Sequence, residues 1–143
     1  MTFQFWPVPD GIEPNCQQGK NICACNRVDA CALSHSGCLN GCHGEQASSL
    51  IKFVSCFEGS DREGSCQPAK SDSCAAAAGL EAQAINACLS NTTEVAAIQT
   101  QIQAASSSVH MFPKVAIDGK ITFAQTDAAV AKALCSKGVQ SAC

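Results

Sequence analysis

Residues 16–31 read CQQGKNICACNRVDAC and hold four of the twelve cysteines in this 143-residue chain. The cysteine count is even, and the cytosolic glutathione pool would keep so many thiols reduced. Each disulfide typically adds about 2–4 kcal/mol of stability, mainly by restricting the unfolded chain. We therefore expect disulfides in an oxidising compartment, formed by all twelve cysteines: Cys16, Cys23, Cys25, Cys31, Cys38, Cys42, Cys56, Cys66, Cys74, Cys88, Cys135 and Cys143.

The remaining composition predicts one small domain with a thin core. Alanine and cysteine inflate the hydrophobic content of 46%, and aromatic residues make up only 5%. A chain of this length suits one domain better than two. We therefore expect a single disulfide-rich domain over 1–143, in which disulfides compensate for the small apolar core. Its cysteine-rich segment, 12–44, shows no regular apolar period and is expected to be loop-rich.

Charge and hydropathy exclude two classes of partner. The net charge is −3, and the nine Lys and Arg residues form no basic run, so we expect no nucleic-acid partner. No apolar stretch reaches the roughly 18–20 residues that span a bilayer. The first residues also lack the charged and apolar regions of a signal peptide. Because the cysteines indicate an oxidising compartment, we expect a targeting sequence that is absent from this chain.

Outside the cysteine-rich segment, the spacing of apolar residues predicts mixed α and β elements. Short alternation predicts a strand over 3–8. Leu50, Val54 and Phe57 lie at helical spacing and predict a helix that begins at Glu45. The alanine-rich residues 74–89 predict a second helix.

The last third of the chain predicts a helix, a hairpin and a final helix. Asn91 and Glu94 resemble a capping box at the start of the third helix. Asp118-Gly119 lies between two short apolar runs, which is typical of a tight hairpin. Capping and stop residues predict the final helix over 126–138.

The cysteine spacing resembles the signature of the gamma-interferon-inducible lysosomal thiol reductase (GILT) family, C-Q-H-G-x-x-E-C-x-x-N-x-x-x-x-C. The matching residues are Cys16, Gln17, Gly19, Cys23, Asn26 and Cys31. Gln18 and Ile22 depart from the signature, which has His and Glu there. Residues 54–58 and 112–120 resemble two further segments of the family. Four cysteines have no counterpart in its pattern, and two extra disulfides among them would account for their number: Cys25, Cys38, Cys42 and Cys74.

This resemblance implies an α/β (α+β), thioredoxin-like fold, which this chain contains in incomplete form. The family carries its redox pair, Cys-x-x-Cys, upstream of the signature, and these 143 residues contain no such pair. The resemblance therefore implies the fold and the disulfides without transferring the activity. It also implies a cis peptide bond before Pro113, ahead of the hairpin.

The incomplete fold leaves an open position in the expected sheet, between the second strand and the hairpin. The strand over 3–8 could fill it, a cleaved upstream segment could remain bound there, or a partner chain could cover it. Phe3, Phe5 and Trp6 gather at this end of the chain, and aromatic residues are enriched in interfaces. We therefore expect residues 1–12 to contact another protein subunit.

Other cysteine-based sites compete with structural disulfides. Cys38 and Cys42, or Cys23 and Cys25, could exchange with thiols. A zinc site could be drawn from the first pair with His43, or from the second pair, but structural zinc normally uses two regularly spaced ligand pairs. His35 and His110 are isolated in the sequence, and no nucleophile motif surrounds them. We therefore expect no metal and no cofactor.

Two hypotheses for function remain. The first is a non-catalytic GILT-like domain that serves as a structural or interaction subunit. Its location would be an organelle lumen, such as that of the lysosome, secretory pathway or thylakoid, or the extracellular space. The alternative is a thiol–disulfide oxidoreductase whose Cys-x-x-Cys segment is absent from this chain or replaced by Cys38 and Cys42. The missing motif favours the first hypothesis.

Overall fold

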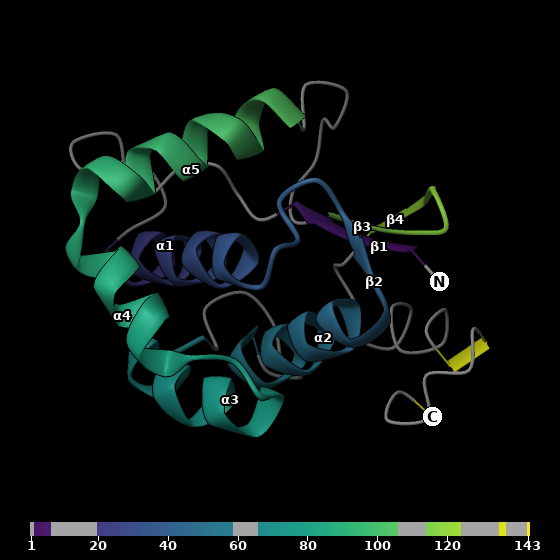
Figure 1. Cartoon of the computed structure of the whole chain (residues 1–143), viewed down its shortest axis with the longest axis horizontal. Coiled ribbons are helices and arrows are strands. Elements are labelled where there is room, and N and C mark those ends of the chain that lie inside the picture. The colour runs from purple at the N-terminus through teal and green to yellow at the C-terminus, as the bar shows by residue number, and fades with distance from the viewer. Residues whose placement is uncertain (1, 7–19, 59–65, 106–113, 124–134, 137–142) are drawn as a thin grey trace.

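The structure is a computed structural model that describes residues 2–6, 20–58, 66–105, 114–123, 135–136 and 143. Figure 1 shows a group of helices at one end of the molecule and a small sheet at the other, with α2 beside the sheet. The elements are, in order, β1 (Thr2–Trp6), α1 (Lys20–His35), β2 (Cys42–His43), α2 (Gly44–Glu58), the 3₁₀ turn η1 (Pro68–Lys70), α3 (Ser71–Ala78), α4 (Ala82–Ser90), α5 (Thr92–Ala105), β3 (Lys114–Ile117) and β4 (Lys120–Phe123). The expected α+β, disulfide-rich class is confirmed.

The strands form one sheet in the order β2-β1-β3-β4, and all neighbouring strands are antiparallel. Phe3 is opposite Ile117 in β3, and Thr2 is opposite His43 in β2. The N-terminal strand therefore lies between β2 and the hairpin, which is the first of the three expected solutions. Two reciprocal hydrogen bonds connect Thr2 with Asp118, at 2.9 and 2.8 Å.

The predicted hairpin forms at Asp118-Gly119. Both residues have positive φ, 50° and 78°, as a two-residue turn of the type I′ class requires. Glycine adopts this conformation without steric cost, and aspartate tolerates it better than most residues. The positive φ angles of the turn therefore explain why Asp-Gly was a reliable sequence signal for it.

We expect Gly119→Ala to lower the free energy of unfolding by about 1 kcal/mol, because a Cβ opposes left-handed backbone. The cost is in the backbone alone, since a Cβ at Gly119 would meet no atom within 4 Å. Asp118→Asn is the control: it keeps tolerance of positive φ and the acceptor for Thr2. Urea unfolding of both variants checks the prediction, and equal midpoints for Gly119→Ala and wild type would contradict it.

The expectation of a loop-rich segment over 12–44 is wrong for residues 20–35, which form α1. Small residues hide the helical period, because alanine and cysteine occupy buried positions that large apolar residues usually fill. The buried residues of α1 are also distributed around much of its circumference: Cys23, Cys25, Val28, Ala30, Cys31, Ala32 and Leu33. A helix buried on several sides lacks the single apolar stripe that sequence analysis detects.

The single helix expected over 74–89 is also corrected, because Gly79 divides it into α3 and α4. Gly79 has a φ of 75°, and the Leu80 amide donates to the Ala75 carbonyl at 2.8 Å. This is the usual left-handed end of a helix. The alanine content predicted helix correctly, while the glycine within it determined where the helix ends.

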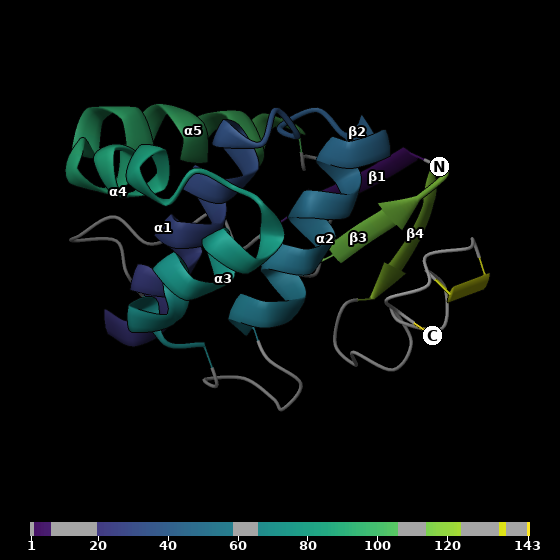
Figure 2. The ribbon, with the colours of Figure 1, turned by 60° about the horizontal axis from the view of Figure 1, so that its bottom comes forward.

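The core forms where α1 packs against α2, α4 and α5, and where α2 packs against α3 and β1. Figure 2 shows α2 between the sheet and the other helices. The rings of Phe53 and Phe57 stack with centroids 5.5 Å apart, and both are fully buried. Leu33, Leu50 and Ile85 are fully buried members of the same core.

The N-terminal aromatic residues contribute to this core. Phe3 and Phe5 are only 2% and 3% exposed, because the chain itself covers them. These two rings are therefore not available to a partner, which corrects the expectation for them. The side chain of Trp6, the peptide bond before Pro113, His110 and the helix expected over 126–138 lie outside the described residues. Contact between residues 1–12 and another polypeptide stays a prediction.

Candidate functional site

Disulfides are the dominant chemical feature of the structure. Five of them have both cysteines among the described residues: Cys25–Cys66, Cys31–Cys88, Cys38–Cys42, Cys56–Cys74 and Cys135–Cys143. Cys23 is also disulfide-bonded, and no described cysteine is free. Cys16 lies outside the described residues. Most of these sulfur atoms are buried among the helices, so the disulfides form part of the core.

The pairing corrects one expectation about the four cysteines without family counterparts. Only Cys38 and Cys42 pair with each other, whereas Cys25 pairs with Cys66 and Cys74 with Cys56. Helix packing explains this different pairing, since α2 and α3 lie side by side and bring positions 56 and 74 together.

The candidate redox pair, Cys38 and Cys42, forms a disulfide in the segment that connects α1 to α2. The Gly41 amide donates to the Cys38 carbonyl at 3.0 Å and closes a tight turn between the two cysteines. Cys38 and Cys42 are 0% and 3% exposed. Disulfide exchange needs an attacking thiolate to reach a sulfur atom, and this burial opposes such an attack. The same bond occupies the sulfurs that the zinc alternative with His43 would need as thiolates.

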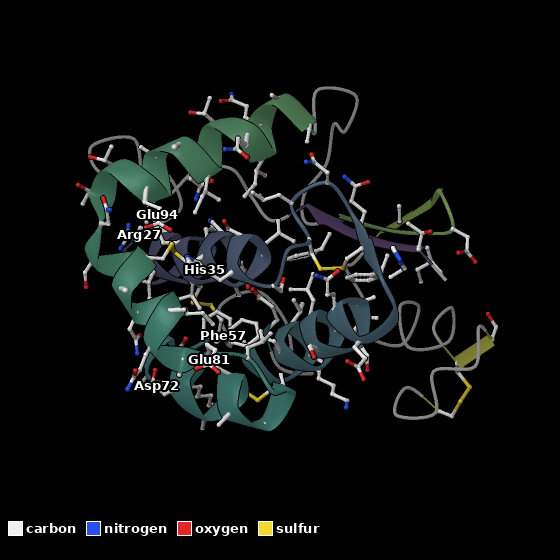
Figure 3. All side chains as sticks on the ribbon, in the orientation of Figure 1. Arg27, His35, Phe57, Asp72, Glu81 and Glu94 are labelled. Carbon is white, nitrogen blue, oxygen red and sulfur yellow. A yellow bond between two sulfur atoms is a disulfide. The ribbon has the colours of Figure 1, made fainter. Side chains whose placement is uncertain are left out.

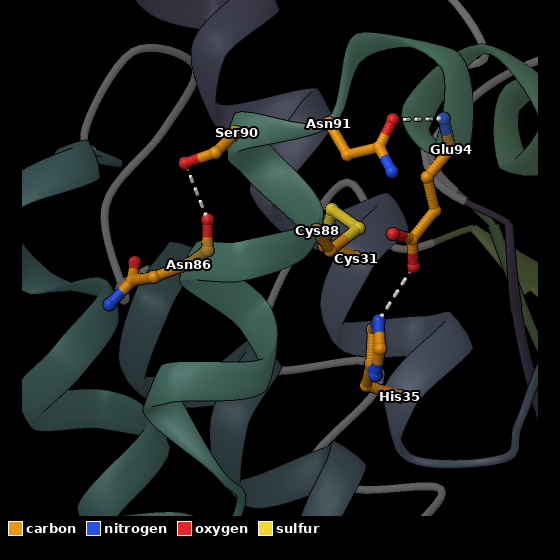
Figure 4. The surroundings of a disulfide bond; sticks show 7 residues. All are labelled: Cys31, His35, Asn86, Cys88, Ser90, Asn91 and Glu94. Atoms are coloured by element: carbon orange, nitrogen blue, oxygen red, sulfur yellow. Dashed lines mark hydrogen bonds and ion pairs between the residues drawn. A yellow bond between two sulfur atoms is a disulfide. The ribbon is translucent and has the colours of Figure 1, made fainter.

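The Cys31–Cys88 disulfide lies beside His35 and Glu94, two side chains that sequence analysis did not predict to be in contact. His35 Nε2 and Glu94 Oε1 are 2.9 Å apart, and their side chains are 35% and 36% exposed. A His35 ring nitrogen, Cys88 Sγ and a Glu94 carboxylate oxygen all lie within 4.8 Å of one another. Figure 4 shows the disulfide next to this pair, and Figure 3 shows His35 and Glu94 where α1, α4 and α5 meet. His35 is therefore not isolated.

Local structure holds this cluster from both sides. Cys31 and His35 are one helical turn apart on α1, so they share a face. Asn91 links α4 to α5, and its Oδ1 accepts a hydrogen bond from the Glu94 amide at 3.1 Å, as the expected cap requires. The Asn91 amide donates in turn to the Cys88 carbonyl at 2.9 Å. The sequence signals were the i, i+4 spacing on α1 and the cap before Glu94.

A second buried polar group lies between α1 and α2. Asp29 is 3% exposed, and its Oδ1 has no hydrogen-bond partner. Burial raises the pKa of Asp29 well above 3.8, and a side-chain hydrogen bond to Glu58 and the charge of Glu58 raise it further. The Asp29 carboxyl is therefore held in its protonated form over a wider pH range than an exposed carboxyl. Sequence analysis did not predict that these two acids meet, because they lie 29 positions apart on different helices.

Comparison with known proteins identifies the family. A model of the family described as "Gamma interferon inducible lysosomal thiol reductase (GILT)" matches residues 7–78, which is half of the chain. The chain belongs to the GILT family. The GILT match covers α1, β2, α2 and α3, and with them the cysteines from Cys16 to Cys74. No curated protein and no solved structure matches the chain.

Membership of the GILT family and the disulfides together indicate an oxidising compartment, such as the lysosome or the extracellular space. Among the described residues, no helix is both long and apolar enough to cross a bilayer. The disulfides and the family thus agree with the oxidising compartment that the cysteine content first indicated.

Proposed function

We propose that this GILT-family chain is a non-catalytic, disulfide-stabilised domain that serves as a structural or interaction subunit of a larger assembly. The observation that carries the proposal is where the disulfides lie. Cys25–Cys66, Cys31–Cys88 and Cys38–Cys42 are all buried at both ends, and the first two connect α1 to distant segments. Disulfides that work in exchange reactions need an accessible, activated cysteine instead.

The proposed setting is an organelle lumen or the extracellular space, and the proposed partners are other protein subunits that contact the N-terminal segment. The burial of Phe3 and Phe5 limits this contact to the rest of residues 1–12. The antiparallel position of β1 inside the sheet means that the segment has an intramolecular role as well.

One observation favours the alternative function, a thiol–disulfide oxidoreductase. Cys42 lies two residues before Gly44, where α2 begins, and a helix N-terminus lowers the pKa of a nearby thiol and activates it. Cys38 would then act as its exchange partner. This arrangement requires the turn at residues 38–42 to open, because both cysteines are buried.

An insulin-reduction assay with a dithiol donor distinguishes the two functions. We expect the oxidised chain to give no rate above the donor alone at acidic or neutral pH, because the paired sulfurs are covered. Cys38→Ser tests the alternative, and Cys56→Ser is the matched control because it opens a disulfide with one exposed end. A wild-type rate that Cys38→Ser abolishes and Cys56→Ser retains would contradict the non-catalytic proposal.

A further inference from the structure

The cluster of His35, Glu94 and the Cys31–Cys88 disulfide places four metal-binding side chains at one point. We propose that reduction of this disulfide creates a zinc site in which Cys31 Sγ, Cys88 Sγ, a His35 ring nitrogen and a Glu94 carboxylate oxygen are the ligands. Among the described residues, this is the one group of three or more His, Cys, Asp and Glu side chains close enough to hold a metal ion. The inference goes beyond the proposed structural role, because it concerns the reduced form of a disulfide that the structural role needs in its oxidised form.

The distances suit a tetrahedral ion after small movements. Zinc binds thiolate sulfur at about 2.3 Å and imidazole nitrogen at about 2.0–2.1 Å, which places tetrahedral ligands roughly 3.5 Å apart. The His35, Cys88 and Glu94 ligand atoms already lie within 4.8 Å of one another. Cys31 Sγ is bonded to Cys88 Sγ at 2.03 Å and separates from it on reduction. The required changes in ligand separation are therefore about 1–2 Å, which side-chain rotation supplies.

The chemistry of the ligands favours zinc over harder cations. Two thiolates and an imidazole form a soft ligand set that suits zinc, whereas magnesium and calcium prefer oxygen ligands. His35 and Glu94 are about one third exposed, so an ion can approach from solvent, while both cysteines lie beneath them. In the oxidised protein, the 2.9 Å contact between His35 and Glu94 holds both side chains on the solvent side of the disulfide.

The reaction balances with a named reductant. A dithiol transfers two electrons and two protons to the disulfide, which yields two thiols, and leaves as a disulfide itself. A phosphine supplies the two electrons instead and becomes a phosphine oxide, while water supplies the oxide oxygen and the two protons. Zinc binding then releases the two thiol protons, because thiolate is the metal ligand. The S–S bond and the metal site exclude each other, so the oxidised protein is expected to bind no zinc here.

The decisive experiment opens this disulfide while leaving the others oxidised. Cys31→Ser frees the Cys88 thiol beside His35 and Glu94, and alkylation with mass mapping checks that Cys88 alone is free. We expect Zn²⁺ to bind this variant in calorimetry, and Co²⁺ to give the sulfur-to-metal charge-transfer band of a thiolate ligand. Adding His35→Ala should weaken binding by roughly 10–100-fold or more, because one ligand is lost. Wild-type oxidised protein should bind neither ion.

Two controls separate this site from any free thiol. Cys56→Ser frees Cys74 between α2 and α3, outside the cluster, and should show no charge-transfer band. Cys31→Ser/Cys88→Ser removes both sulfurs and should lose the band as well. Equal zinc affinity in Cys31→Ser and in its His35→Ala derivative would overturn the proposal, as would a Cys31→Ser protein that binds no Co²⁺ or Zn²⁺.

A folding defect in Cys31→Ser leaves the proposal testable. If the variant is unfolded without metal, Zn²⁺ should restore its helical circular dichroism, because metal binding then supplies folding free energy. Failure of zinc to restore it counts against the site. As a second measurement, wild-type protein is reduced with a phosphine under native conditions. Zinc should then slow alkylation of Cys31 and Cys88 at least about tenfold, and His35→Ala should abolish that protection.

Discussion

Replacing both Cys31 and Cys88 with alanine is expected to lower the free energy of unfolding by about 3–4 kcal/mol. This disulfide joins α1 to α4 across a sequence separation of 57, the longest among the described disulfides. A long closed loop restricts the unfolded chain most, although the remaining disulfides shorten the loop that this one closes. Because the apolar core is thin, this loss is a large part of the total stability of a domain.

Cys135→Ala/Cys143→Ala is the matched control. That disulfide spans a separation of 8 and has an exposed end, so its removal is expected to cost about 2–3 kcal/mol. Urea unfolding at one pH gives both values. A Cys31/Cys88 variant that loses no more stability than the Cys135/Cys143 variant would contradict the assignment of the first disulfide as a principal structural link.

The second large effect is a dependence of stability on pH that comes from Asp29. The raised pKa means that the folded chain holds a proton that the unfolded chain releases at lower pH. The contribution of Asp29 is therefore complete below the pKa of the unfolded chain, and it is lost as the pH rises through the raised, folded pKa. We therefore expect the Asp29 contribution to make the protein more stable in acid than at neutral pH.

Asp29→Asn should remove this dependence and raise the unfolding midpoint at neutral pH, because the amide carries no charge and still donates to Glu58. Glu45→Gln, at an exposed carboxylate in the first turn of α2, should keep the wild-type pH profile. Urea unfolding between about pH 4 and pH 8 covers the range in which a buried carboxyl titrates. A wild-type midpoint that rises with pH across this range would contradict the prediction.

Sequence analysis correctly predicted the elements that short sequence patterns determine. The capping residue Asn91, the apolar spacing from Leu50 to Phe57 and the turn pair Asp118-Gly119 each lie within or beside the element that they predict. By contrast, α1 escaped prediction because its buried positions carry alanine and cysteine. The break at Gly79 was missed because alanine-rich flanks dominate any average over the segment.

The candidate site was harder to predict because its parts come from separate elements. Cysteine pairing depends on which helices pack together, so the Cys25–Cys66 and Cys56–Cys74 connections follow from tertiary structure. His35 and Glu94 meet only because α1 and α5 lie side by side, 59 positions apart in sequence. The family signature identified which cysteines matter but not which side chains would surround them.

The placement of β1 sets an order of events during synthesis. Its strand partner beside the turn, β3, lies more than a hundred residues later in the chain, and Thr2 is bonded to Asp118 across a separation of 116. Ribosomes add about 5–20 residues per second, so β1 waits on the order of ten seconds for its strand partner β3. The helices α1 to α5 all precede β3 in the chain and can form within that interval. A chaperone that binds exposed aromatic strands would therefore find its target in β1, and release it when the hairpin emerges.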